Sequence, residues 1–234
     1  MIGELTAAAP VRRSALDDRR FRTVLLAVAA AAGLVLWLVG APQYLFEYLF
    51  KVLPAVSAGT GFFENHSPGG TITRLFEPDS FFNVRGSPAP ARVLTILIAL
   101  AILIVTLAVL RRPATTSAGR GLEAAAIVAA TPLIASYSWG THLVLLLLPM
   151  FVLITWSVRR RDWTVMALVA VGWLLIGPGH KLLQALLVMG YSNLVMLRLL
   201  AELGVLGIAA IWVASLLAVR RSANHLDPAH QDRA

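Results

Sequence analysis

The stretch SYSWGTH, residues 136–142, interrupts an apolar run that extends from residue 122 to residue 158. The run is too long for one helix, because about 20 residues suffice to cross a bilayer core about 30 Å thick. We therefore interpret it as two membrane helices joined by a polar turn at the membrane surface. Hydroxyl, indole and imidazole groups gather in this turn, so it is either a surface anchor or part of a functional site.

The composition of the whole chain indicates a polytopic membrane protein. Of its 234 residues, 58% are hydrophobic and 14% are charged, and the mean hydropathy is +0.77. Soluble domains carry about 25% charged residues. Cysteine is absent, which excludes disulfides and thiolate metal sites. We expect neither a metal nor an organic cofactor.

The net charge of +8 comes mainly from arginine clusters at the ends of apolar segments. This is the positive-inside pattern of membrane proteins and not the pattern of a nucleic-acid-binding surface, so we expect no nucleic acid partner. With both termini inside, 14 of the 20 Lys and Arg residues lie on the cytoplasmic side. The clusters thus predict a multi-pass protein of the plasma (inner) membrane, with cytoplasmic segments at residues 1–22 and 220–234.

Six apolar segments predict an all-α transmembrane domain over residues 23–219. The segments are residues 23–40, 93–110, 122–135, 143–158, 163–177 and 203–219. The first could also be a signal peptide cleaved near residues 39–41, but it is longer than a typical signal core, which favours an uncleaved anchor. The sequence Pro178-Gly179-His180-Lys181 is expected to break the fifth helix. Arg198 and Glu202 are spaced to pair on one face of the helix that follows.

Residues 41–91 contain no span and are predicted to form an outer loop. Within this loop, Pro42 can begin a helix and Pro54 can end it. Between the two prolines, apolar side chains recur at three- and four-residue spacing, at Tyr44, Leu45, Tyr48, Leu49 and Val52. This pattern predicts an amphipathic helix that lies on the outer membrane surface, in contact with membrane lipids.

Polar side chains are concentrated in two outer stretches, Glu64-Asn65-His66-Ser67 and Ser138-Trp139-Gly140-Thr141-His142. With the leucine-rich segment 145–148 before Pro149, they resemble the Asn-Gln-Ser-like and Ser-Trp-x-His-His-Leu-like motifs of the GT87 family (DUF2029 type). Members of this family are polyprenol-phosphate-sugar-dependent glycosyltransferases of the GT-C superfamily. The resemblance extends over most of this chain and over the C-terminal half of such an enzyme, and it implies a GT-C-like partial fold.

The resemblance implies a membrane glycosyltransferase that moves a hexosyl or pentosyl group from a polyprenyl-phosphate donor to a lipid or cell-envelope glycan acceptor on the outer face. Such a site must hold a phosphate whose negative charge grows as the sugar leaves. We expect substrate contacts from His142, Trp139, Ser138, Asn65, His66, Ser67, Arg74 and Lys181. Alternatively, His142 caps the helix that follows it. Trp139 can belong to an aromatic belt, and Asn65 with Ser67 can stabilise a turn.

The resemblance does not identify a catalytic base in this chain. Enzymes of the family hold an acidic residue, thought to act as the base, in an outer loop of their N-terminal half, and no such loop precedes Thr23. We therefore expect the chain to act with a companion chain that supplies this half, or to use Glu64 as a substitute. A non-catalytic scaffold subunit is the alternative. A transporter would carry paired ionisable residues inside its spans, and the sequence has almost none.

Overall fold

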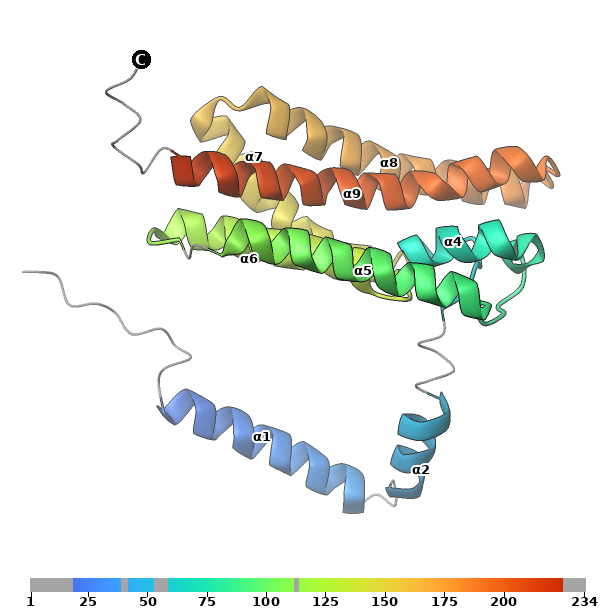
Figure 1. Cartoon of the computed structure of the whole chain (residues 1–234), viewed down its shortest axis with the longest axis horizontal. Coiled ribbons are helices and arrows are strands. Elements are labelled where there is room, and N and C mark those ends of the chain that lie inside the picture. Colours follow the sequence, from blue (N-terminus) through green and yellow to red (C-terminus); the bar gives the residue numbers. More distant parts are fainter. Residues whose placement is uncertain (1–18, 39–41, 53–58, 112–113, 225–234) are drawn as a thin grey trace, which may run out of the picture. The chain divides into compact units, whose positions relative to one another are not determined.

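The computed structural model describes residues 19–38, 42–52, 59–111 and 114–224, and these are almost entirely helical (Figure 1). The chain divides into two compact units after residue 54. In chain order the elements are α1 (Arg19–Leu38), α2 (Pro42–Glu47), η2 (Tyr48–Val52), α4 (Pro68–Phe76), η3 (Pro78–Phe81), α5 (Ala89–Leu110), α6 (Ser117–Ile134), η4 (His142–Leu146), α7 (Leu147–Arg160), α8 (Trp163–Val188) and α9 (Leu194–Asn224).

The first unit contains α1, α2 and the π-helical turn η2. α2 begins at Pro42, as the sequence predicts, and continues directly into η2. Lys51 Nζ lies 3.5 Å from Glu47 Oε1, one helical turn away. α1 covers most of the predicted span 23–40. That α1 crosses the membrane and that the second helix lies on its surface stay predictions, and Pro54 lies outside the described residues.

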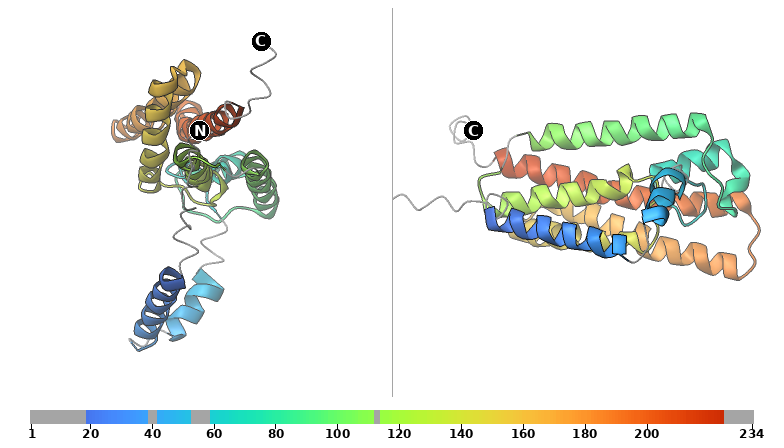
Figure 2. Two further views of the ribbon diagram at one scale, coloured as in Figure 1. Left: turned by 90° about the vertical axis from the view of Figure 1, so that its left-hand side faces the viewer. Right: turned by 90° about the horizontal axis from the view of Figure 1, so that it is seen from below.

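Among its described residues, the second unit contains four helices that are long and apolar enough to cross a membrane. They are Ala89–Leu110, His142–Arg160, Trp163–Val188 and Leu194–Ala223. This confirms a helical membrane protein, whereas the number of six spans stays a prediction. α6 covers most of the predicted span 122–135 but starts five residues earlier, at Ser117. It packs against α5, α7 and α9 (Figure 2). The polar turn at residues 136–142 separates α6 from α7, also as predicted.

α8 is longer than predicted. It continues through Pro178 to Val188, so the predicted helix break at residues 178–181 is wrong. Proline removes one backbone hydrogen bond, but packing against a neighbouring helix can compensate for that loss. α9 provides this packing, since a Cβ added at Gly179 would lie only 3.2 Å from Leu203 Cδ1.

α9 also starts earlier than the predicted span 203–219, at Leu194. Its N-terminal turns bury Leu197 in a small apolar cluster with Phe81 and Leu183. Burial of this apolar surface stabilises helical structure outside the segment that hydropathy alone assigns to the membrane.

The pair predicted between Arg198 and Glu202 is not formed. Glu202 Oε1 accepts instead from Arg74 Nε at 2.8 Å, and Arg198 Nη2 donates to the Pro78 carbonyl at 2.9 Å. The four-residue spacing of Arg198 and Glu202 reflects α9 alone, whereas α4 and η3 bring other partners to the same part of the helix. The prediction is therefore wrong because tertiary contacts replace a local one.

α8 and α9 pack backbone to backbone over two glycines. A Cβ added at Gly172 would lie 2.9 Å from the Gly207 carbonyl oxygen, and one added at Gly207 would lie 2.8 Å from the Gly172 carbonyl oxygen. Small residues at such positions are typical of helix pairs in membranes. This contact fixes the rotation of α8 about its axis, and so the orientation of the face that carries Lys181 and Gln184.

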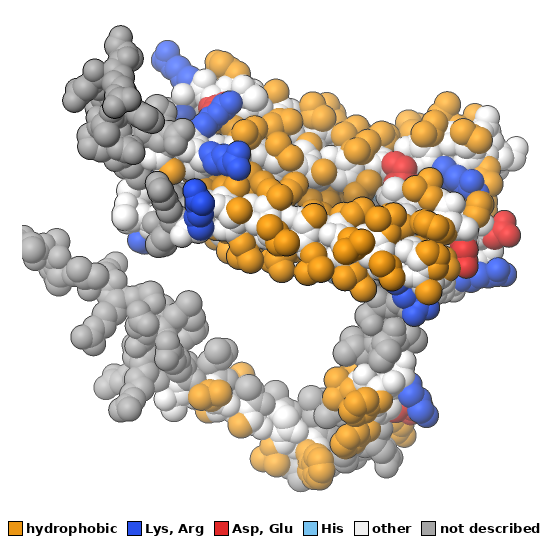
Figure 3. All heavy atoms as spheres, in the orientation of Figure 1, with side chains coloured by type: hydrophobic (Ala, Val, Ile, Leu, Met, Phe, Trp, Pro, Cys, Tyr) orange, Lys and Arg blue, Asp and Glu red, His pale blue; other side chains and the backbone are white. Residues whose placement is uncertain are grey.

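Charged side chains gather at the two ends of the second unit, and apolar side chains cover the surface between them (Figure 3). At one end Asp162 caps α8 by accepting from the Val165 N–H at 3.2 Å, and it also accepts from Arg221 Nη1 at 2.5 Å. At the other end lies the loop that precedes α4. This distribution is typical of a helix bundle that spans a membrane.

Candidate functional site

The two predicted motif stretches lie next to each other. The His66 N–H donates to the Ser138 carbonyl at 2.8 Å, which binds the loop before α4 to the turn before η4. Asn65, which is fully buried, strengthens this junction. Its Nδ2 donates to the Ser136 carbonyl at 3.1 Å, and its Oδ1 accepts from the Ser138 N–H at 3.0 Å. Stretches about 70 residues apart in sequence therefore form one unit.

Ser67 caps α4 and belongs to the same junction. Its Oγ accepts from the Gly70 N–H at 3.2 Å and donates to the Ser136 carbonyl at 3.1 Å. Glycine is required at position 70, because a Cβ there would lie 2.5 Å from the Asn65 carbonyl oxygen. These contacts match the structural alternative for Asn65 and Ser67, the stabilisation of a turn before α4.

Arg74 is buried, and its guanidinium is used inside the protein. Besides the bond to Glu202, Nη1 donates to the carbonyls of Phe62 and Asn65, each at 3.2 Å. Thr71 Oγ1 also lies between the two charged groups and bonds to both. Arg74 thus anchors the loop of residues 61–65 to α9, and its donors do not face a cavity.

His66 is 1% exposed and lies against α8 and α9. Its ring contacts the His180 ring edge to face, with centroids 4.8 Å apart. Gly204 provides the space, because a Cβ added there would lie 2.2 Å from His66 Nδ1. Neither ring nitrogen makes a hydrogen bond of normal geometry.

The buried environment of His66 disfavours its protonated form. Burial, and then the proximity of His180 and Arg74, lower its pKa to about 4, although the Ala201 backbone carbonyl acts in the opposite direction. We therefore expect a neutral imidazole at pH 7. A neutral, buried imidazole packs between helices and supplies no positive charge to a phosphate.

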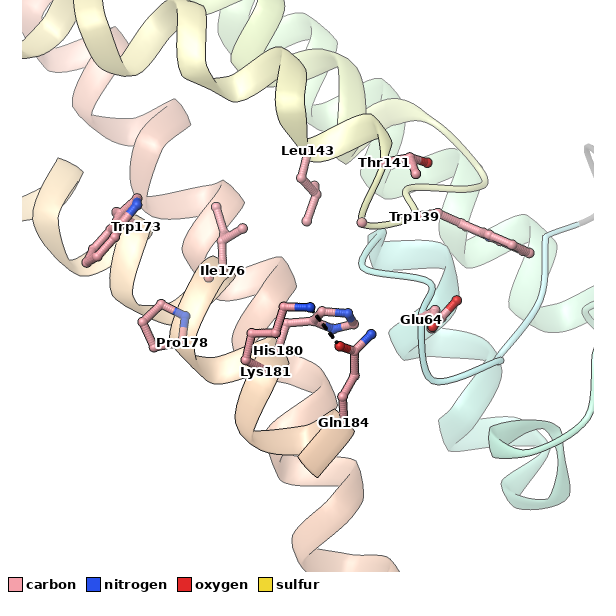
Figure 4. Close-up of a pocket in the computed structure, with 12 residues that line it drawn as sticks. Glu64, Trp139, Thr141, Leu143, Trp173, Ile176, Pro178, His180, Lys181 and Gln184 are labelled. Carbon is pink, nitrogen blue, oxygen red and sulfur yellow. Dashed lines mark hydrogen bonds between the residues drawn. The ribbon is translucent and has the colours of Figure 1, made fainter. Parts of the chain in front are cut away.

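An open cavity of about 620 Å³ lies between α8 and the turn before η4 (Figure 4). Glu64 borders it from the loop before α4, and Lys181 and Gln184 border it from α8, with Lys181 Nζ 3.1 Å from Gln184 Oε1. The indoles of Trp139 and Trp173 also line it. The cavity therefore combines one carboxylate, one ammonium group and two large aromatic surfaces.

Of Glu64 and the eight residues expected to contact substrate, three line the cavity and six do not. Glu64, Trp139 and Lys181 line it. The candidate residues Asn65, His66, Ser67, Arg74 and Ser138 are buried and do not line it. Exposed His142 starts η4, and its Nδ1 accepts from the Trp139 N–H of the preceding turn at 3.2 Å. The N-cap residue of η4 is Thr141 and no side chain caps this helix, so the capping alternative for His142 is wrong.

Sequence reasoning missed His180, Gln184 and Trp173. The expected helix break at residues 178–181 hid a regular pattern, since one face of α8 carries the residues Trp173, Ile176, Gly177, His180, Lys181 and Gln184. These positions recur at three- and four-residue spacing, which is the period of a helix face. A helix assumed to continue through Pro178 would have placed His180, Gln184 and Trp173 on this face.

The cavity presents hydrogen-bond donors, one carboxylate and two aromatic surfaces to a ligand. Within the described ranges, no group of three His, Asp or Glu residues is placed to hold a metal ion. Lys181 and His180 can donate to an anion, and Trp139 can stack on a flat apolar or sugar face. Glu64 is the carboxylate among the lining residues and can accept a proton.

The fold and this site define a class: a helical membrane protein with a polar cavity at one end of its bundle. Comparisons with protein-family models, curated proteins and solved structures gave no significant match.

Proposed function

We propose that this chain is a membrane glycosyltransferase, or a subunit of one, that uses a polyprenyl-phosphate sugar as donor. The acceptor is a lipid or a cell-envelope glycan on the outer face of the plasma membrane. The single observation that supports this most is the cavity that brings Glu64, Trp139 and Lys181 together at one end of the helix bundle.

In this proposal Lys181 and His180 hold the donor phosphate. Charge-assisted hydrogen bonds of this kind are stronger than neutral ones, and they strengthen further as the phosphate gains negative charge in the transition state. Trp139 or Trp173 stacks on the sugar, as aromatic rings do with apolar faces of ligands. The cavity volume of about 620 Å³ lies within the usual range for a small-molecule site.

Glu64 is the proposed general base. An acceptor hydroxyl oxygen attacks the anomeric carbon, the bond between that carbon and the phosphate oxygen breaks, and the hydroxyl proton passes to a carboxylate. The lipid phosphate leaves with the bonding electrons. A companion chain that carries the acidic loop of the enzymes this sequence resembles is the other source of the base.

A non-catalytic scaffold is the second candidate function, and one observation favours it. Asn65, Ser67 and Arg74 all donate hydrogen bonds to backbone carbonyls within the protein. A chain that preserves these contacts preserves its fold, whether or not the cavity binds a donor.

Donor binding separates the two functions. A labelled polyprenyl-phosphate mannose is titrated against the full chain in lipid nanodiscs, with Lys181→Ala as the test variant. The matched control is Arg85→Ala, which removes an exposed cation that does not line the cavity. The enzyme proposal predicts that Lys181→Ala weakens binding about tenfold or more, since a charged hydrogen bond contributes about 1.5–3 kcal/mol. Equal binding by the two variants would favour the scaffold.

The role of Glu64 is tested by Glu64→Gln against Glu77→Gln. Glu64→Gln should keep donor binding and lose sugar transfer, measured with any companion chain that supports turnover of the wild type. Glu77 does not line the cavity, so Glu77→Gln should keep both. Unchanged transfer by Glu64→Gln would assign the base to the companion.

A further inference from the structure

A smaller hollow of about 220 Å³ lies beside the first turns of α5. It is formed by α5, the end of α6 and the loops that flank α4. Among the described residues, none lines both this hollow and the polar cavity, so the two are separate sites. The polar side chains that line the hollow are those of Ser87, Arg92, Thr95 and Ser136.

The Arg92 guanidinium is held beside the hollow with two of its nitrogens free. Its Nε donates to the Ser87 carbonyl at 2.6 Å, whereas Nη1 and Nη2 bond to no described residue. Arg74 and Arg198 differ, because their terminal nitrogens donate to backbone carbonyls. Two adjacent guanidinium nitrogens match two oxygens of a phosphate group. Arg92 can therefore bind a phosphate without giving up a contact within the protein.

The hydroxyl groups of the hollow divide into acceptors and one donor. Thr73 Oγ1 donates to the Gly69 carbonyl at 2.7 Å, so Ser87 Oγ is the donor in its hydrogen bond with Thr73. Thr95 Oγ1 donates to the backbone carbonyl four residues before it at 2.8 Å. Ser87 and Thr95 thus have only acceptor lone pairs left for a ligand. The Ser136 hydroxyl bonds to no described residue and can donate.

These groups select among phosphate esters. The hydroxyl acceptors suit an ester whose alcohol carries free hydroxyls, since those hydroxyls can donate to Ser87 and Thr95. No acidic or aromatic residue is among the described residues that line the hollow. A quaternary ammonium head group, which cannot donate a hydrogen bond, would find neither a carboxylate nor an aromatic face there. It would also lie close to the Arg92 cation.

The far end of the hollow is apolar, which favours a lipid over a free phosphate. Ile96, Ala99 and Ile134 line this end. From Arg92 to Ala99, seven residues of α5 at about 1.5 Å each give about 10 Å. The polar layer on each side of a bilayer is only about 5–8 Å thick. If α5 spans the membrane with Arg92 at its surface, the hollow extends from the polar layer into the hydrocarbon.

The hollow differs from ordinary lipid-facing surface because it reaches buried polar structure. Ser87 is 3% exposed, and Gly59 and Gly69 are buried. Gly69 lets α4 approach α5 closely, since a Cβ there would lie 3.0 Å from Thr95 Cγ2. By contrast, the hollow of about 330 Å³ along α7 and α8 is lined only by apolar and aromatic side chains. That second hollow offers nothing that a head group could recognise.

We propose that the hollow beside α5 binds the head group of an anionic phospholipid whose alcohol carries free hydroxyls, as in phosphatidylglycerol. The phosphate oxygens accept from Arg92 and Ser136, and the head-group hydroxyls donate to Ser87 and Thr95. The first methylene groups of an acyl chain lie against Ile96. This lipid is a bound component that joins α4, α5 and α6, not a reactant, so the inference is independent of the proposed function.

The test compares two exposed arginines, of which only one lines the hollow. The full chain in detergent micelles is titrated with dioleoyl phosphatidylglycerol and dioleoyl phosphatidylcholine, and bound lipid is counted by native mass spectrometry. The wild type should bind phosphatidylglycerol about tenfold more tightly, because charged hydrogen bonds to phosphate are stronger than neutral ones. Arg92→Gln should abolish this preference. Arg85→Gln, which removes the same charge outside the hollow, should keep it.

A second variant and a soluble probe complete the test. The Ser136 hydroxyl has no described partner, so Ser136→Ala should keep the melting temperature and weaken phosphatidylglycerol about threefold or more. The proposal is overturned if Arg92→Gln and Arg85→Gln bind phosphatidylglycerol equally, or if Ser136→Ala binds it as the wild type does. It is also overturned if glycerol 3-phosphate displaces the lipid at equal concentration, since the hollow would then be a site for soluble phosphates.

Discussion

The loop before α4 and the exposed face of α8 use their polar side chains in opposite ways. In the loop, Asn65, Ser67 and Arg74 are buried and bonded to partners within the protein. On α8, Lys181 is exposed, and its one hydrogen bond is to the flexible Gln184 side chain. The comparison shows that the polar side chains of the loop hold the fold together. Those on the face of α8 are exposed and accessible to a ligand.

The largest effect on stability is expected from Arg74→Ala. This change leaves Glu202 and three backbone carbonyls without their charged partner. Removing one member of a buried ion pair costs about 3–5 kcal/mol, and the loss here should lie near the lower end because the Glu202 side chain is 25% exposed. The free energy of unfolding in mixed micelles measures the loss. Arg85→Ala, at an exposed position, is the control and should change stability by less than about 0.5 kcal/mol. Similar losses for both variants would show that the loop is not held by Arg74.

Gly204→Ala tests the packing of His66 against α9. The added methyl group would overlap the imidazole ring, and overpacking of this kind costs about 1–3 kcal/mol. Replacing His66 by alanine in the same chain should recover part of the loss, which a double-mutant cycle measures. Gly121→Ala is the matched control, since its Cβ would meet only Val152 at 3.9 Å. No coupling between positions 66 and 204 would contradict the contact.

The stability of the protein should fall as the pH drops from about 6.5 toward 4. The pKa of His66 is lowered to about 4 in the folded protein, so below pH 6.5 the unfolded chain binds a proton that the folded protein does not. The unfolded state is thereby favoured, by about 2 kcal/mol at pH 5. Thermal unfolding of wild type and His66→Phe across this pH range measures the effect. Parallel curves for the two proteins would assign the pH dependence to other groups.

The smallest effect on stability is expected on α8. Lys181→Ala removes an exposed side chain with one hydrogen bond, so the free energy of unfolding should change by less than about 0.5 kcal/mol. The same variant should lose donor affinity. A large loss of stability would show that Lys181 is structural and would remove the contrast between the two regions.

The sequence predicts the membrane class and the start or end of several helices, because these depend on interactions between residues close together in the chain. Hydropathy and Pro42 act within a few residues, and both α2 and the polar turn at residues 136–142 are found where they are expected. The extension of α8 through Pro178 and the partner of Glu202 could not be read in this way. Both depend on contacts with other helices, and such contacts override local signals.

For the candidate site, the sequence does not distinguish residues that line the cavity from residues that hold the fold together. It singled out Glu64, Trp139 and Lys181, which line the cavity, together with residues that the fold uses for itself. Nothing in the spacing of Asn65 or Arg74 distinguishes a substrate contact from an internal hydrogen bond. That distinction depends on burial, which for these residues is decided by segments distant in sequence.

The position of the bound sugar tests the central claim most directly. A polyprenyl-phosphate sugar with a photoreactive group on the sugar ring is bound to the full chain in nanodiscs, irradiated and mapped by mass spectrometry. We predict saturable labelling of peptides that contain residues 139–143 or 173–184, which line the polar cavity. Labelling confined to the separate hollow of about 220 Å³ beside Arg92, Thr95 and Ser136, or labelling that does not saturate, would contradict the account.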